Sequence, residues 1–156
     1  MLSILIPTYN YDVEALVTEL HAQSAACDIN FEILCYDDGS TNLELIAKNN
    51  SINQLKHATY KVLDSNIGRS AIRNLLAKDA NYDLLLFLDA DVIPVKNDFI
   101  SKYTTAFTPS TQLIFGGVNY QDKKPNKEQM LRWAFGRKRE VVPLKKKICL
   151  LKFFIL

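Results

Sequence analysis

Hydrophobic residues along the chain form short apolar runs that alternate with segments of helical spacing. Leu2–Pro7 (LSILIP) is a continuous apolar run closed by proline, which is typical of a strand buried on both faces. The next segment has apolar residues at helical spacing and predicts an amphipathic helix over residues 12–25, with Asp12 as its cap. Phe31–Tyr36 (FEILCY) predicts a second strand, which ends at the turn formed by residues 37–40 (DDGS).

The alternation continues along the chain and predicts an α/β protein. Thr41 or Asn42 can cap a helix after the second strand. Further strands are expected at Tyr60–Leu63, Asp83–Leu88 and Leu113–Phe115, and further helices at Gly68–Ala80, Asn97–Phe107 and Lys127–Phe135. Such βαβ units favour a mostly parallel sheet, which binds ligands beyond the carboxyl ends of its strands. Polar residues follow three of the expected strands, at residues 7–10, 37–40 and 89–91.

The composition is that of one soluble globular domain. Of 156 residues, 48% are hydrophobic and 23% are charged, which excludes wholesale disorder. The three cysteines are far apart and form no CxxC pair, so the sequence indicates neither a disulfide framework nor a zinc site. The start lacks the basic region of a signal peptide, and no apolar stretch reaches the roughly 20 residues of a spanning helix. We therefore expect a cytoplasmic protein.

Charge divides the chain into an acidic body and a basic end. Residues 1–122 contain 8 Lys and Arg against 15 Asp and Glu, whereas residues 123–156 contain 11 against 2. We interpret residues 1–122 as the main domain and residues 123–156 as a basic C-terminal segment. This segment favours an anionic partner, such as phosphate or the inner face of a membrane, and a solvated basic tail is the alternative.

Asp89-Ala90-Asp91 is the sharpest chemical signal. The two carboxylates stand at i and i+2 directly after the apolar run DLLLFL, so they project from one side of an extended backbone. Without His or Cys nearby they form a hard-oxygen site suited to Mg²⁺ or Mn²⁺, which usually completes its shell with substrate phosphates. The alternative is that both aspartates cap the next segment.

The other polar segments offer groups that bind a nucleotide. Asp37 and Asp38 present acceptors to the N–H and O–H groups of a base or ribose, and Tyr9 presents an aromatic face for stacking. Arg69 and Arg73 lie one turn apart at the start of a helix, which favours phosphate. The structural alternatives are an ordinary turn, a packing tyrosine and surface arginines.

Several common sites are missing from the sequence. No GxGxxG follows a strand, and neither GxxxxGK[ST] nor GxSxG occurs, which disfavours dinucleotide dehydrogenases, P-loop proteins and α/β hydrolases. His21 and His57 lack metal-ligand spacing. The lysine run at residues 145–147 has no nucleic-acid-binding module around it, so we expect no nucleic-acid partner.

Four motifs occur in order along the chain: SILIPTYN, EILCYDDGST, NIGRSAIRN and LLLFLDADVIP. Together they resemble the start of a family 2 glycosyltransferase with the GT-A fold, and the resemblance covers roughly residues 1–117. The resemblance implies a Rossmann-like, three-layer α/β/α architecture with a mostly parallel sheet. It also implies a hexosyltransferase of polysaccharide biosynthesis that uses a nucleotide-sugar donor, often UDP-linked, and a divalent metal. The acceptor would be a saccharide or lipid-linked saccharide, and transfer usually inverts the anomeric centre.

Carried over residue by residue, the resemblance implies a donor site. Asp38 would bind the base with Asp37 beside it, and Arg73 would face the nucleotide. The implied nucleotide-binding residues are Pro7, Thr8, Tyr9, Asp37, Asp38, Arg73 and Asp89. Asp91, together with Asp89, would ligate the Mn²⁺ or Mg²⁺ that bridges the diphosphate.

The second part of the chain departs from the family's pattern. The family's general base is an Asp or Glu in the second half of the domain, and Asp122, Glu128 and Glu140 do not match its motif. We therefore expect the base to lie beyond the chain end, in a truncated member of the family. The end from Lys145 (KKKICLLKFFIL) fits a truncation, with an interfacial membrane anchor or a frame-shifted end as alternatives.

Two rival functions come from other classes. A truncated nucleotide-binding remnant would bind the donor without transferring sugar. A phosphohydrolase of the haloacid-dehalogenase type would use Asp89 as nucleophile and Asp91 as acid/base. That family's motif normally follows the first core strand and continues with Thr or Val at its fifth position, whereas this chain has Ile93 there.

Overall fold

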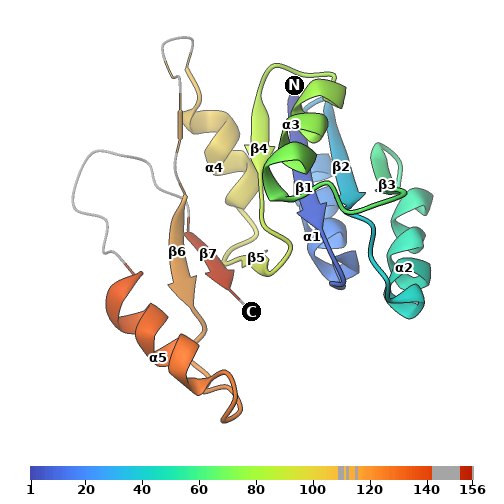
Figure 1. Ribbon diagram of the computed structural model, residues 1–156. Helices are drawn as coiled ribbons and strands as arrows, with labels where there is room; N and C mark the ends of the chain where they lie inside the picture. Colours follow the sequence, from blue (N-terminus) through green and yellow to red (C-terminus); the bar gives the residue numbers. More distant parts are fainter. Residues whose placement is uncertain (109–110, 112, 115, 142–151, 156) are drawn as a thin grey trace. The chain divides into compact units, whose positions relative to one another are not determined.

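The computed structural model describes residues 1–108, 111, 113–114, 116–141 and 152–155. The chain divides into two compact units, Met1–Asp91 and Val92–Leu156 (Figure 1). Each unit contains its own sheet. The first sheet has four strands in the order β3-β2-β1-β4, and the second has three in the order β5-β7-β6. The division at residue 122 that the charge pattern predicts stays a prediction.

The first unit is built on a parallel sheet. Its strands are β1 (Leu2–Thr8), β2 (Phe31–Asp37), β3 (Ala58–Val62) and β4 (Leu85–Phe87). Its helices are α1 (Glu14–Ala26), α2 (Leu43–Asn49), the 3₁₀ helix η1 (Asn50–Gln54) and α3 (Arg69–Asp79). All strand pairs are parallel, and Thr8 lies opposite Asp37 where β1 and β2 end. The predicted α/β class and mostly parallel sheet are confirmed, and the strand ends share one edge.

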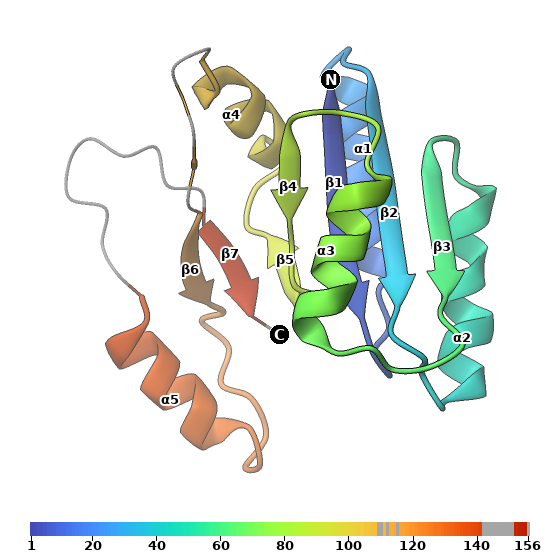
Figure 2. The same cartoon turned by 45° about the horizontal axis from the view of Figure 1, so that its top comes forward.

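Helices cover both faces of this sheet, with α3 on one face and α1 on the other (Figure 2). On the α3 face, Ile72 and Leu76 pack against Leu5 and Leu34. Because side chains alternate along a strand, the intervening residues face α1 and are fully buried: Ile4, Ile6 and Ile33. Each such side chain contributes roughly 1.5–3 kcal/mol of burial free energy. Continuous apolar runs are therefore what a sheet buried on both faces requires.

Short polar side chains set the starts of two helices. Val13 and not the predicted Asp12 occupies the N-cap position of α1, but the Asp12 carboxylate still accepts a hydrogen bond from the backbone N–H of Glu14 at 3.1 Å. Asn42 accepts two backbone N–H groups from the first turn of α2, so Asn42 rather than Thr41 caps that helix. Both residues satisfy N–H groups that have no partner inside the helix.

The second unit begins with β5 (Val92–Pro94) and α4 (Phe99–Ala106), followed by β6 (Gly117–Tyr120), α5 (Met130–Arg139) and β7 (Lys152–Ile155). β7 pairs antiparallel with β5 and parallel with β6. No helix in the described ranges is both long and apolar enough to cross a bilayer.

The strand predicted at Leu113–Phe115 is wrong. Residues 113 and 114 are not in a strand, Phe115 lies outside the described residues, and β6 begins only at Gly117. The physical reason is pairing, because Gly117–Tyr120 lies in register with Lys152–Ile155, a partner that a local apolar pattern does not reveal. Within the end from Lys145, residues 145–151 and Leu156 lie outside the described part of the chain.

Candidate functional site

Asn10 joins the loop after β1 to the loop after β2. Its backbone has a φ of +48°, in the left-handed region, and its N–H donates to the Ser40 hydroxyl at 2.6 Å. Its side-chain oxygen accepts the backbone N–H groups of Thr41 and Asn42, both at 3.0 Å. Asparagine tolerates this backbone conformation better than most residues. The two polar strand ends are therefore one hydrogen-bonded unit.

Asn49 holds the stretch that leads from β1 into α1. It is fully buried at the end of α2. Its amide donates to the Tyr11 carbonyl at 2.9 Å, and its oxygen accepts the Val13 backbone N–H at 3.0 Å. Sequence reasoning missed this residue, because a buried polar residue at a helix end carries no local signal.

The Asp38 carboxylate fixes the loop that precedes α3. Its two oxygens accept the backbone N–H groups of Ile67 at 2.7 Å and of Gly68 at 3.0 Å. Gly68 has a φ of +90° directly before the first residue of α3. The start of α3, with its partial positive charge, is thus held next to the end of β2.

Asp37, the neighbouring aspartate, is used inside the fold. One of its carboxylate oxygens accepts the Tyr60 hydroxyl at 2.6 Å, and the other accepts the Ser40 backbone N–H at 2.8 Å. Burial and the hydrogen bond to Asp37 raise the pKa of Tyr60 well above its usual range. Asp37 and Asp38 therefore point in different directions. Asp37 is hydrogen-bonded inside the fold, whereas Asp38 holds the loop that precedes α3.

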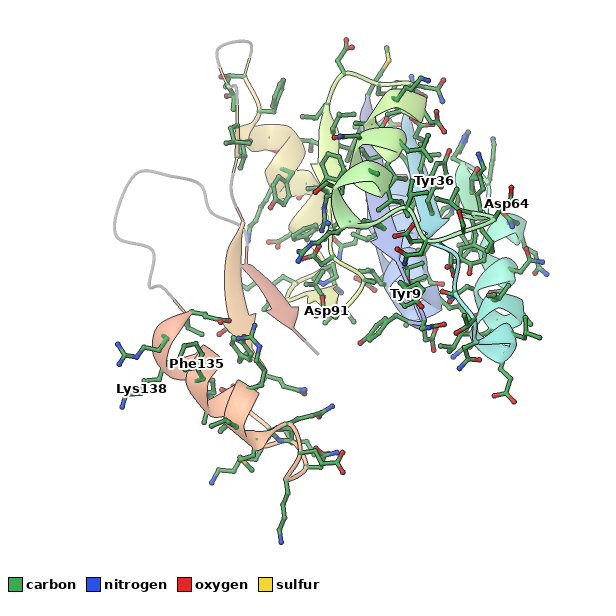
Figure 3. The ribbon with its side chains drawn as sticks, in the orientation of Figure 1. Tyr9, Tyr36, Asp64, Asp91, Phe135 and Lys138 are labelled. Carbon is green, nitrogen blue, oxygen red and sulfur yellow. The ribbon has the colours of Figure 1, made fainter. Side chains whose placement is uncertain are left out.

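A pocket of about 400 Å³ lies at the carboxyl edge of the first sheet. It contains every predicted site residue except Asp37: Pro7, Thr8, Tyr9, Asp38, Arg73, Asp89 and Asp91. Its other lining residues are Asn66, Gly68, Arg69 and Ile72. Tyr9 and Asp91 stand at this edge in Figure 3. Motifs near the two ends of this unit's sequence thus meet in one cavity.

Two arginines from α3 bind Asp89. Arg69 Nη2 lies 3.3 Å from Asp89 Oδ2, and Arg73 Nη2 makes a closer contact with Asp89 Oδ1. The Arg73 side chain is 26% exposed and that of Arg69 is 78% exposed. Arg73 is therefore the more firmly held cation, whereas an exposed pair such as Arg69–Asp89 contributes little to stability.

Asp91 has no hydrogen-bond or ion-pair partner among the residues that the structure describes. Its charge lies near Tyr11, and burial, Asp91 and Asp12 together raise the pKa of that phenol. The described residues contain no cluster of three or more His, Cys, Asp or Glu that could hold a metal ion. A cation here would have at most the two carboxylates of Asp89 and Asp91 as protein ligands. That donor set suits Mg²⁺ or Mn²⁺, which take their remaining ligands from water and phosphate.

Comparison with known proteins identifies the fold and the family. The chain matches Glycosyl transferase family 2 over residues 3–153. An uncharacterized glycosyltransferase of Haemophilus influenzae is 29% identical over 120 residues, which cover 77% of this chain and 47% of that protein.

Two solved structures are similar at low identity. Residues 1–349 of S. aureus TarS superpose with a TM-score of 0.58 at 21% identity, over 83% of this chain and 39% of that chain. TarS 1–349 has also been solved in complex with UDP. The mannosyltransferase PcManGT from Pyrobaculum calidifontis, in complex with GDP-Man and Mn²⁺, gives a TM-score of 0.54 at 17% identity, over 84% of this chain and 38% of that chain.

These likenesses confirm what the four sequence motifs imply about fold and family. The chain spans about half, or less, of the length of the proteins it matches. Its parallel sheet with flanking helices is that of the GT-A glycosyltransferases. The chain belongs to glycosyl transferase family 2.

Proposed function

We propose that this chain binds a nucleoside-diphosphate sugar, with Mn²⁺ or Mg²⁺, for transfer of the sugar to an acceptor hydroxyl. The observation that carries the proposal is the convergence of Asp38, Arg73, Asp89 and Asp91 in one pocket at the carboxyl edge of a parallel sheet. Family membership supports the reaction class, and the complexes of similar proteins with UDP and with GDP-Man support the ligand class.

The base would lie between Tyr9 and Asp38. Tyr9 is half exposed at the pocket and can stack on a planar base. Asp38 uses one lone pair of each oxygen for backbone N–H groups, so both oxygens keep acceptor capacity for an N–H of the base. Uracil offers such an N–H, as other bases also do, so our proposal of UDP as the preferred carrier rests on the family resemblance and on the UDP complex of TarS 1–349.

The diphosphate would lie between Arg73 and Asp91. Arg73 supplies a guanidinium at the pocket, and Asp89 positions that guanidinium. Asp91 supplies an unpaired carboxylate for the cation, with Asp89 as a second ligand. When bound, the cation supplies Lewis-acid neutralisation of the negative charge that develops on the departing nucleoside diphosphate.

Our proposals about the acceptor rest on family membership alone. We propose a saccharide or lipid-linked saccharide acceptor, attack from the face opposite the diphosphate with inversion, and action on the cytoplasmic side of the membrane. We assign no general base among Asp122, Glu128 and Glu140. The function proposed for this chain is therefore donor binding, as part of sugar transfer.

Calorimetric titration with UDP, with Mn²⁺ present and then with a chelator, tests the donor site. We expect the chelator to weaken UDP binding by at least roughly tenfold, since one charged contact is worth about 1.5–3 kcal/mol. Asp91→Asn should bind UDP equally with and without Mn²⁺. GDP in place of UDP tests the base preference, and we expect it to bind more weakly.

Asp83→Asn is the matched control, because Asp83 precedes β4 at the opposite edge of the same sheet. It should keep the Mn²⁺ dependence of the wild type. If Asp91→Asn also keeps it, Asp91 is not a metal ligand. Metal-dependent UDP binding without transfer from any UDP-sugar would favour the nucleotide-binding remnant over the transferase.

A further inference from the structure

One side of α5 is fixed to β6 in the second unit. A Cβ at Gly136 would lie 1.9 Å from the ring carbon Cζ of Tyr120, so only glycine allows this approach. The Trp133 indole N–H donates to the Gln121 carbonyl at 2.8 Å. The helix therefore has a defined inner side, which lies against the strand.

The other side of α5 carries exposed apolar residues. Leu131 is 82% exposed and Phe135, one turn further along, is 55% exposed. Lys138 and Arg139 follow at the spacing that continues the same helical face. Phe135 and Lys138 both project from α5 in Figure 3. We call these four residues, Leu131, Phe135, Lys138 and Arg139, the outer face of α5.

Unpaired positive charge lies on this face and in the stretch that precedes α5. Arg132 pairs with Glu140, and Arg137 pairs with Asp122 at 3.0 Å. Five further basic residues have no acidic partner in the described ranges of the chain: Lys123, Lys124, Lys127, Lys138 and Arg139. The surface thus combines two large apolar side chains with a surplus of cations, and the whole segment 123–156 has 11 Lys and Arg against 2 Asp and Glu.

We propose that the outer face of α5 docks on a membrane surface that contains acidic lipids. Leu131 and Phe135 would enter the boundary between headgroups and acyl chains, while Lys138 and Arg139 would remain among the headgroups. A soluble polyanion accounts for the cations but not for two exposed apolar residues one turn apart. This site lies in α5 and not in the end from Lys145.

Co-sedimentation of the full chain with vesicles tests this docking. We expect binding to vesicles of phosphatidylglycerol and phosphatidylcholine, weakening as salt is raised, and little binding to phosphatidylcholine alone. Trp133, the only tryptophan of the chain, lies on the inner side of α5, where its indole N–H donates to the Gln121 carbonyl. Its emission therefore checks that the packing of α5 against β6 stays unchanged when acidic vesicles bind.

Two pairs of substitutions separate the apolar and the electrostatic parts. Leu131→Ser with Phe135→Ser should weaken binding to acidic vesicles by at least about tenfold, since each buried apolar side chain contributes well over tenfold when fully transferred. Lys138→Glu with Arg139→Glu should weaken it by roughly 25-fold or more, at about fivefold per basic residue. Circular dichroism checks that each variant is folded.

The controls are Leu43→Ser, at a 76% exposed position of α2, and Lys56→Glu with Lys78→Glu, which changes the net charge equally in the first unit. Both should bind acidic vesicles as the wild type does. Equal loss in these controls overturns the proposal. The proposal is also overturned if the variant with Leu131→Ser and Phe135→Ser binds acidic vesicles normally and heparin competes with the vesicles. That result would identify a site for a soluble polyanion. Asp91→Asn should bind vesicles normally, so this test is independent of the donor site.

Discussion

A Cβ at Gly39 would lie 2.7 Å from the carbonyl carbon of Ser65, and Gly39 has a φ of +72°. The turn after β2 therefore touches the backbone of the loop that precedes α3. This contact and the two hydrogen bonds of Asp38 act at the same place, because both bring residues 65–68 to the end of β2. The shape of the pocket therefore depends on glycine at position 39.

Replacing Gly39 tests this close approach. Gly39→Ala combines left-handed backbone strain with a clash against backbone atoms, so we expect a loss of more than about 2 kcal/mol in the free energy of unfolding. Gly68→Ala shows what backbone strain costs without a clash, since no atom lies within 4 Å of the added Cβ. With a φ of +90° and a ψ of 157°, Gly68 has a backbone conformation nearly confined to glycine, so this variant should cost about 1–3 kcal/mol. Urea unfolding measures both variants, and a loss in Gly39→Ala no larger than that in Gly68→Ala would mean that the Ser65 contact is unimportant.

Asp37 should behave as a structural residue. Asp37→Asn weakens the buried hydrogen bond from Tyr60, so the free energy of unfolding should fall by about 1.5–3 kcal/mol. UDP affinity of the folded protein should stay close to that of the wild type, because Asp37 does not line the pocket. Urea unfolding and calorimetry on the same sample check both results. A large loss of UDP affinity with normal stability would instead support the nucleotide-binding role predicted from the sequence.

The sequence predicted the first unit well because its signals are local. LSILIP and FEILCY are each apolar enough to be buried on both faces, and both became strands. The sequence could not show that Asp37 is bonded inside the fold while Asp38 lines the pocket. That distinction depends on Tyr60, which lies on β3 and donates to Asp37. β5 and β7 were missed for a similar reason, because their pairing joins residues about sixty positions apart.

The two arginines of α3 should contribute unequally to nucleotide binding. Arg73→Ala should weaken UDP binding by roughly 10–100-fold, as expected for a charge-assisted contact in a partly enclosed pocket. Arg69→Ala should weaken it by about fivefold or less, because its side chain is 78% exposed. Calorimetry with and without Mn²⁺ measures both. The reverse ranking would mean that Arg69 is the main phosphate ligand.

Glu32, at the opposite edge of the first sheet from the pocket, should make stability depend on acid pH. Burial raises the pKa of its carboxyl group, but hydrogen bonds from Ser3 and Asn81 outweigh that effect and hold the pKa below its usual value. A carboxyl with a lower pKa in the folded state stabilises the protein above its unfolded-state pKa. This stabilisation is lost as the pH falls through the folded-state pKa.

Urea unfolding between about pH 5 and pH 3 measures this dependence. Glu32→Gln should reduce the loss of stability over that interval. Glu44→Gln, at an exposed position of α2, is the control and should leave the dependence as in the wild type. An unchanged profile in Glu32→Gln would exclude Glu32 as a source of the acid sensitivity.

The hydrogen bonds of Asn10 limit how this pocket can be exchanged between relatives. Because one side chain holds both strand-end loops, residues 8–10 and 40–42 form a single module, although about thirty residues separate them in the chain. Grafting one loop from a relative would remove the hydrogen bonds between Asn10 and residues 40–42, each of which contributes about 0.5–1.5 kcal/mol. Chimeras designed to change nucleotide preference must therefore transplant the two loops together.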